Sequence, residues 1–238
     1  MGRVVTAVVA AAFALAVASP GAAREGWLGK YVDLTVGAKG TAGGNVWTKP
    51  SSGPGADVGF AKVRGGYGAG GGLYLDARFI KFIGLEMDFL FELDKVWEDI
   101  TINSFPFTNT LEALNLRIPL LVKGVLPVPM ARLALVIGPE FVIPLSTSSS
   151  VDEPGNVIIL DRYGLSANDK VSTMLTMGFG VVIELPLGIR LPIDLRASHN
   201  LTQPKDYYDR VSVVGKTYRV TYQNSWDFRL LLGLGYEF

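Results

Sequence analysis

Three features of the sequence predict an all-β chain that crosses a membrane as an antiparallel, up-and-down barrel of eight strands. The first is the segment 226–238, where an apolar or aromatic residue stands at every second position and charged residues fall between. The second is the recurrence of this alternation in seven earlier segments. The third is the pattern of connections, in which short turns and long polar loops alternate along the chain.

The first four strands are predicted from period-two patterns, because alternate residues of a strand face opposite sides. In the third strand, Leu85, Met87 and Phe89 alternate with Glu86 and Asp88. One face of each strand is therefore apolar and the other polar or charged. The segments with this pattern are 31–39, 73–79, 85–93 and 114–123.

The remaining four strands repeat the scheme over 132–140, 172–185, 190–198 and 226–238. In the last of them we expect Leu230, Leu232 and Leu234 to contact lipid and Arg229 to point into the lumen. Most of the eight segments are close to the roughly 9–11 residues that a tilted membrane strand requires.

The connections indicate how the strands are oriented. Tight turns are predicted at 80–83, 127–129 and 186–189, and long loops at 40–66, 94–109, 146–170 and 200–222. This alternation puts all long loops on one side and both termini on the other, as in outer-membrane barrels. A further hairpin that includes residues 157–160 would raise the strand count to ten.

The amino terminus has the features of a secretory signal peptide. Arg3 precedes an apolar run over residues 4–17, and small residues follow up to Ala23. We expect cleavage after Ala23, which leaves residues 24–238 as one barrel domain; an uncleaved membrane anchor is the alternative. No later stretch has the roughly 20 apolar residues of a transmembrane helix.

Composition excludes several classes of protein. The formal net charge is +0, so nothing favours nucleic acid as a partner. The sequence contains no cysteine, which excludes disulfides and thiolate metal sites. Together with the signal peptide, this favours the envelope of a Gram-negative bacterium.

A soluble calycin-type barrel is the main structural alternative, since its strands also alternate. Its apolar face would line the interior and its charged face would meet water. The asymmetry of the loops, the terminal Phe238 and the aromatic residues near strand ends favour the membrane barrel.

The signal peptide, the eight alternating segments and the ending Leu234-Gly235-Tyr236-Glu237-Phe238 resemble the small outer-membrane β-barrel proteins of the OmpA/OmpX type. The resemblance implies a multi-pass protein of the outer membrane, in contact with its lipid and lipopolysaccharide. It also implies that Tyr236 and Phe238 form the signal read by the barrel-assembly machinery. We expect the protein to be a monomer.

The inward faces carry many opposite charges. An eight-stranded barrel is just wide enough for side chains to fill, and buried charges are costly unless they are paired. We therefore predict a luminal charge network that plugs the barrel, and an ion pathway is the alternative. The predicted members are Asp76, Arg78, Glu86, Asp88, Glu92, Arg117, Arg132, Glu140, Asp194, Arg196, Asp227 and Arg229.

The sequence offers little sign of catalysis or of a cofactor. Ser198 and His199 are adjacent, so they face opposite sides of a strand and cannot form a catalytic pair. The glycine run 65–72 lacks the Gly-Lys-Ser/Thr of a phosphate-binding loop and instead suits strand curvature. We expect no catalytic residue, no metal and no cofactor.

The sequence thus predicts a non-enzymatic outer-membrane protein with a structural or surface-interaction role. A small porin-like channel for ions or solutes is the second hypothesis, and an outer-leaflet lipid hydrolase is a remote third.

Overall fold

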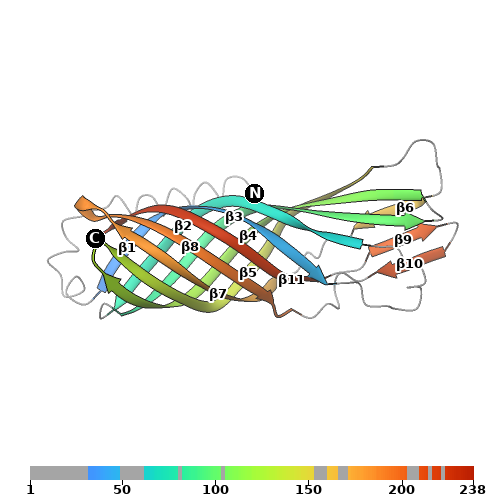
Figure 1. Ribbon diagram of the computed structural model, residues 1–238. Coiled ribbons are helices and arrows are strands. Elements are labelled where there is room, and N and C mark those ends of the chain that lie inside the picture. Colours follow the sequence, from blue (N-terminus) through green and yellow to red (C-terminus); the bar gives the residue numbers. More distant parts are fainter. Residues whose placement is uncertain are drawn as a thin grey trace.

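Eight antiparallel strands form one closed barrel in the computed structural model (Figure 1). The structure describes residues 32–48, 62–79, 82–102, 105–152, 160–165, 171–202, 209–213, 216–220 and 223–238. The strands follow one another around the wall in the order β1-β11-β8-β7-β5-β4-β3-β2. They are β1 (Val32–Thr48), β2 (Lys62–Phe79), β3 (Ile83–Ile102), β4 (Phe105–Val128), β5 (Ala131–Asp152), β7 (Ser172–Glu184), β8 (Ile189–Asn200) and β11 (Gln223–Glu237).

The barrel closes where the first strand pairs with the last. Val36 of β1 lies opposite Tyr236 of β11, and the ladder continues to Val46 opposite Trp226. Because the barrel is closed, every strand has a hydrogen-bonding neighbour on both sides. A sheet that crosses lipid requires this, since lipid offers no partners for backbone N–H and C=O groups. The prediction of an eight-stranded barrel is confirmed.

The alternation along each strand separates an apolar outside from a polar inside. On β11 the exposed fractions of Leu230 and Leu232 are 42% and 54%, whereas those of Asp227 and Arg229 are 0% and 8%. The predicted orientations of these residues are therefore correct. Exposed apolar side chains on the outer wall suit lipid, because they would be unfavourable in water.

Short turns lie at one end of the barrel, here called the turn end, and the opposite end is called the loop end. Residues 129–130 connect β4 to β5, and a 3₁₀ turn at Pro186–Gly188 connects β7 to β8. The chain ends at the turn end, where the Phe238 amide donates to the Leu34 carbonyl oxygen. In outer-membrane barrels the turn end is periplasmic and the loop end extracellular.

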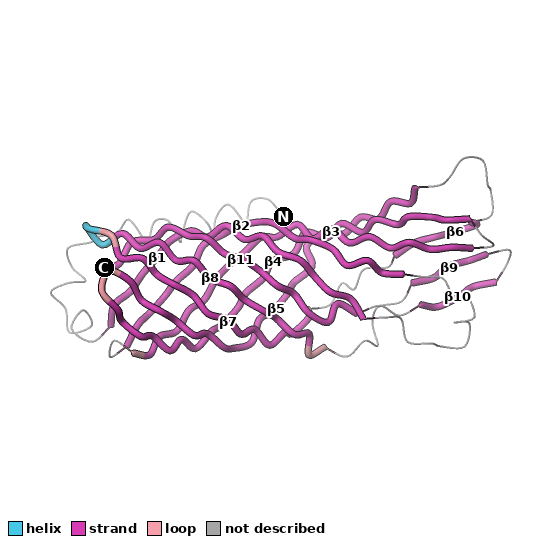
Figure 2. The backbone as a smooth tube through the Cα atoms, viewed as in Figure 1, coloured by secondary structure: helices cyan, strands magenta, loops and turns pink. Residues whose placement is uncertain are grey.

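The predicted long loops are wrong in extent. Most strands run on past the expected ends, and residues 103–104 alone separate β3 from β4 where we expected a loop over 94–109. Figure 2 shows these extended strands projecting from the loop end. Outside the bilayer both faces of a strand can be wet, so the ladder continues while the period-two signal fades.

Three short strands form a second, small sheet in the order β10-β9-β6. They are β6 (Leu160–Leu165), β9 (Asp209–Val213) and β10 (Lys216–Val220), and they come from the two connections β5–β7 and β8–β11. The alternative of ten barrel strands is therefore wrong. The extra strands pair with one another and add nothing to the wall of the barrel.

The glycine run predicted to lie in a curved strand falls within β2. A Cβ atom on Gly70 or Gly72 would overlap the backbone carbonyl oxygen of Phe91 or Phe89 on the neighbouring strand. These two positions therefore need glycine because β2 and β3 approach each other closely there.

We expect Gly72→Ala to lower the free energy of unfolding by about 1–3 kcal/mol, the usual cost of overpacking. Gly124→Ala is the matched control, since a Cβ there has nothing within 4 Å. Urea unfolding of the refolded protein measures both. Equal stability of the two variants would contradict the close approach.

None of the described residues belongs to a helix long and apolar enough to cross a membrane. The predicted signal peptide and its cleavage site at Ala23 lie outside the described residues.

The luminal charge network as candidate functional site

The charged side chains inside the barrel form three clusters. The central cluster consists of Lys39, Asp76, Glu86, Asp88, Lys123, Asp194 and Arg196. Toward the loop end lies the loop-end cluster of Glu92, Asp94, Arg117, Glu140, Asp227 and Arg229. The rim cluster, at the turn end, comprises Asp33, Arg78, Arg132, Glu184, Arg190 and Glu237.

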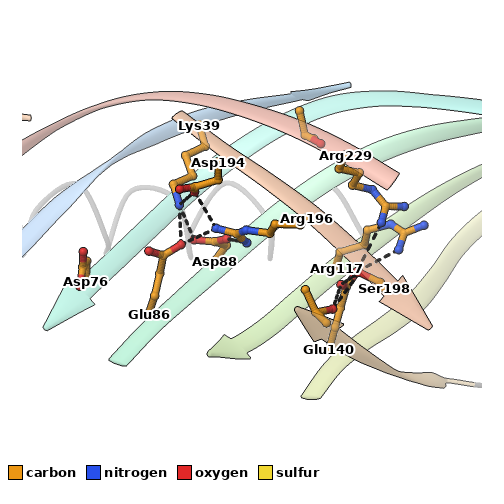
Figure 3. A network of polar contacts seen from close by, with 12 residues as sticks. Lys39, Asp76, Glu86, Asp88, Arg117, Glu140, Asp194, Arg196, Ser198 and Arg229 are labelled. Carbon is orange, nitrogen blue, oxygen red and sulfur yellow. Dashed lines mark hydrogen bonds and ion pairs between the residues drawn. The ribbon is translucent and has the colours of Figure 1, made fainter. Parts of the chain in front are cut away.

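The central cluster joins strands on opposite walls (Figure 3). Lys39 of β1 places its Nζ 2.5 Å from Glu86 Oε1 and 2.8 Å from Asp194 Oδ2. Arg196 of β8 reaches across to β3, where its Nη1 lies 2.6 Å from Asp88 Oδ2 and its Nη2 contacts Glu86. These side chains are almost completely buried.

Lys123 extends the central cluster toward the turn end. Its Nζ donates to Asp76 Oδ2 at 2.7 Å and also contacts Glu86. On the other side, Lys39 Nζ lies 4.6 Å from the centre of the Tyr74 ring, within the range of a cation–π interaction. Each lysine ammonium thus has more than one favourable partner.

The loop-end cluster is organised around two arginines. Arg117 of β4 contacts Glu92, Glu140 at 2.9 Å and Asp94 at 3.1 Å. Arg229 of β11 donates through Nε to Glu92 at 2.8 Å and through Nη2 to Asp227 at 2.9 Å. Figure 3 shows these two guanidinium groups beside each other above Glu140.

Hydroxyl groups complete the coordination of Glu140. Its Oε2 accepts hydrogen bonds from Thr176 Oγ1 at 2.5 Å and from Ser198 Oγ at 2.9 Å. Thr41 Oγ1 donates in the same way to Glu92 at 3.2 Å. A carboxylate buried in a lumen needs such partners, because an unpaired one costs several kcal/mol.

The rim cluster holds the penultimate residue. Glu237 accepts hydrogen bonds from Arg132 at 2.6 and 3.1 Å and from Arg190 at 2.7 and 3.1 Å. Arg132 lies on β5 and Arg190 on β8, so Glu237 links the last strand to two others. Arg78 pairs with Asp33 at the same level.

Apolar side chains occupy much of the remaining lumen. Leu90, Leu121, Met174 and Leu231 point inward and are between 1% and 3% exposed. A small cavity remains between the central and rim clusters, lined among others by Tyr74, Asp76, Val125, Arg132 and Val182. The interior of the described barrel is therefore packed rather than open.

All twelve residues named from the sequence lie in these clusters, and each makes at least one ion pair. Three further residues are buried in the barrel, Asp94, Thr41 and Asn45, although the sequence placed them in predicted loops. The alternation of apolar and charged residues breaks off after Asp94, because the next outward residue is Lys95 and the next inward residue is the buried Val96. The pattern therefore gave no signal that the strand continues.

Ser198 and His199 point to opposite faces of β8. The Ser198 hydroxyl is bound in the lumen to Thr176 and Glu140, whereas the His199 ring lies 4.6 Å from the Trp226 ring. At the turn end, the Tyr236 and Phe238 rings make an edge contact at 5.0 Å. One ring pair lies at each end of the apolar band, where aromatic residues are enriched in membrane barrels.

No protein-family model matches the sequence, and no curated protein matches it. Among solved structures, the chain is similar to the outer membrane protein OprG from Pseudomonas aeruginosa, with a TM-score of 0.54 and 13% identity. That match covers 87% of this chain and 96% of OprG.

Two further structures align over similar lengths. A major outer membrane protein from Thermus thermophilus has a TM-score of 0.47 and 14% identity, with coverage of 87% and 99%. Neisserial surface protein A has a TM-score of 0.39 and 12% identity, with coverage of 86% and 97%. At sequence identities this low, a structural match is evidence for the fold alone. The match to OprG supports the assignment of an outer-membrane barrel fold.

The closed wall, the apolar exterior, the charged interior and the OprG-like fold together define the class of protein. The chain is an integral β-barrel protein of the bacterial outer membrane, which it crosses with eight strands. The prediction of a fold like that of small outer-membrane barrels is confirmed by the eight-stranded wall and by the match to OprG.

Proposed function

We propose that the protein is a sealed outer-membrane barrel with a structural or surface-interaction role and no enzymatic activity. The observation that carries this proposal is the set of ion pairs across the lumen, from Arg196 to Asp88 and from Arg229 to Glu92. These pairs span strands on different walls at two levels of the barrel.

The seal follows from the cost of opening it. A permeating ion would have to separate Lys39 or Arg196 from carboxylates at 2.5–2.9 Å, within a lumen whose packed side chains leave little room for water to replace them. Breaking a buried pair costs about 3–5 kcal/mol. An ion would have to break pairs in two successive clusters. The lumen should therefore not stay open at ambient temperature.

A role at the cell surface is supported by what projects from the loop end. β4 and β5 remain paired as far as Thr108 opposite Asp152, whereas β5 and β7 separate beyond Val142 opposite Ser172. The extended strands and the small sheet of β6, β9 and β10 give this end a large polypeptide surface (Figure 2). Exposed connections on a rigid scaffold are where binding residues concentrate.

The same proposal includes a route to the membrane. Residues 1–23 would direct export and be removed after Ala23. Tyr236 and Phe238 would then present the terminal strand to the barrel-assembly machinery. The mature monomer would sit among outer-membrane lipids and lipopolysaccharide.

Planar-bilayer recording on the refolded protein tests the seal. We expect no steady conductance from the wild type, because both clusters block the lumen. Glu86→Ala should produce transient openings, since it removes the carboxylate shared by Lys39, Lys123 and Arg196.

The matched control is Glu112→Ala, which removes an acid paired with Lys95 on the exposed outside of the barrel. Like the wild type, this variant should show no steady conductance. Steady, charge-selective currents from the wild type would overturn the seal and favour a small ion or solute channel.

A further inference from the structure

The wall of the barrel has a seam, where the first strand, β1, pairs with the last, β11. Every other pair of neighbours in the wall is linked by the stretch of chain that runs from one strand to the next. Pairing β1 with β11 requires the two ends of the wall to be brought together, which costs conformational entropy. Unlike the other pairs, the seam has no connecting segment that holds its strands side by side.

Tyr74 of β2 lies across this seam on the inside of the barrel. Gly37 of β1 is opposite Tyr74 on one side and opposite Gly235 of β11 on the other, so the three residues form one row over three strands. A Cβ atom on Gly37 would overlap Cε1 of the Tyr74 ring, and one on Gly235 would overlap the Tyr74 hydroxyl oxygen. The ring therefore extends over β1 and ends on the last strand.

The glycine at position 235 makes room for this ring. The three atoms nearest to a Cβ on Gly235 are all side-chain atoms, two from Tyr74 and one from Thr35. A close approach of two backbones, which explains Gly70 and Gly72, therefore does not explain Gly235. The space that a side chain would fill there is occupied by the tyrosine.

The ring is also tied to the central cluster. Tyr74 is 3% exposed, and Lys39 Nζ lies 4.6 Å from the centre of its ring. Lys39 is itself held by Glu86 at 2.5 Å and by Asp194 at 2.8 Å. A cation in this position attracts the face of the ring, so Tyr74 has a fixed place over the seam.

We propose that Tyr74 is a latch that holds the seam closed and keeps the wall from opening sideways between β1 and β11. Its contact with Gly235 exists only when the first and last strands are paired. A buried aromatic ring contributes a large apolar area, and part of that burial is lost whenever the seam opens. The latch acts on the wall, whereas the ion pairs of the proposed seal act along the axis of the lumen.

Unfolding rates of the refolded full-length barrel in urea, followed by heat-modified mobility on gels, test the latch. We expect Tyr74→Ala to unfold about tenfold faster than the wild type, because a contact that opposes opening is lost. Tyr74→Phe should unfold at nearly the wild-type rate, since the ring carbon Cζ also reaches the position over Gly235. If Tyr74→Ala does not fold, Tyr74→Leu takes its place with the same expectation, because leucine is too short to reach Gly235.

A disulfide across the seam distinguishes a latch from ordinary core packing. Ala38 and Leu234 face outward opposite each other on β1 and β11, and the protein has no cysteine of its own. Oxidised Ala38→Cys/Leu234→Cys would lock the seam, and Tyr74→Ala should then change the unfolding rate by less than about threefold. The matched control is Val122→Cys/Ile137→Cys, which locks the outward pair between β4 and β5 and should leave the effect of Tyr74→Ala intact.

Gly235→Ala provides a second test of the same contact. It should speed unfolding of the wild type, but not of Tyr74→Ala, where the ring no longer occupies the space. A wild-type unfolding rate in the Tyr74 variant would overturn the proposal. An effect of Tyr74→Ala that is equally large with either disulfide would overturn it too. Neither result depends on bilayer conductance, so the latch and the seal can fail separately.

Discussion

Arg117→Met should lower the free energy of unfolding by about 3–5 kcal/mol, the usual cost of removing one partner from a buried ion pair. Arg117 contacts Glu92, Asp94, Glu140 and Asp227, and its side chain is only 3% exposed. Without it, four carboxylates share the single guanidinium group of Arg229. Methionine fills a similar space. The loss of stability is therefore due to the missing positive charge rather than to a cavity.

Urea unfolding in detergent micelles or lipid vesicles measures this change. Lys95→Met is the control, because the Lys95–Glu112 pair at 2.8 Å lies on the partly exposed outer face. An exposed pair contributes about 0–1 kcal/mol. If the two substitutions had equal effects, the loop-end cluster would not hold the barrel together as described.

Leu232→Arg should destabilise the folded barrel by about 2–4 kcal/mol, the cost of placing arginine on the lipid face near the bilayer midplane. Leu232 stands at the centre of the outward row Phe228, Leu230, Leu232, Leu234 and Tyr236, and its side chain is 54% exposed. In lipid, the guanidinium group would have neither water nor a counter-charge.

The same unfolding measurement applies to Leu232→Ala, which should cost much less because lipid fills the vacated space. A barrel standing in water would show the opposite order, since an exposed arginine is then harmless. Tolerance of Leu232→Arg in vesicles would therefore contradict the orientation of β11.

The strands and their faces could be predicted because two environments act on alternate residues. Within the bilayer, lipid selects apolar side chains such as Leu230, while the narrow lumen admits charge such as Arg229. Past the bilayer this contrast ends. The ladder between β3 and β4 nevertheless continues to Ile102 opposite Phe105, which the sequence pattern did not indicate.

The inward apolar residues also escaped prediction. Leu121 and Leu231 are each 1% exposed and point into the lumen, between charged neighbours on the same face. A leucine that fills space between the charged clusters is the same residue type as a leucine that faces lipid. Its odd or even place in the strand shows which way it points, whereas its hydrophobicity does not.

Most members of the network could be predicted, but the pairing could not. Which acid meets Arg196 depends on the stagger of β8 relative to β3 across the barrel, and stagger leaves no trace in the local sequence. Asp94 and Asn45 were assigned to loops for the reason given above.

Thiol accessibility on β8 tests the central claim, a dry charged lumen inside a lipid-facing wall, most directly. The protein has no cysteine, so single variants can be labelled without background. In vesicles, Ser198→Cys should resist a charged, water-soluble reagent until the barrel is unfolded, because Ser198 is 1% exposed and bound to Glu140. Leu195→Cys, on the opposite face, should react with a lipid-soluble maleimide in the folded barrel. Rapid labelling of Ser198→Cys by the water-soluble reagent would contradict the account, since it requires a water-filled lumen.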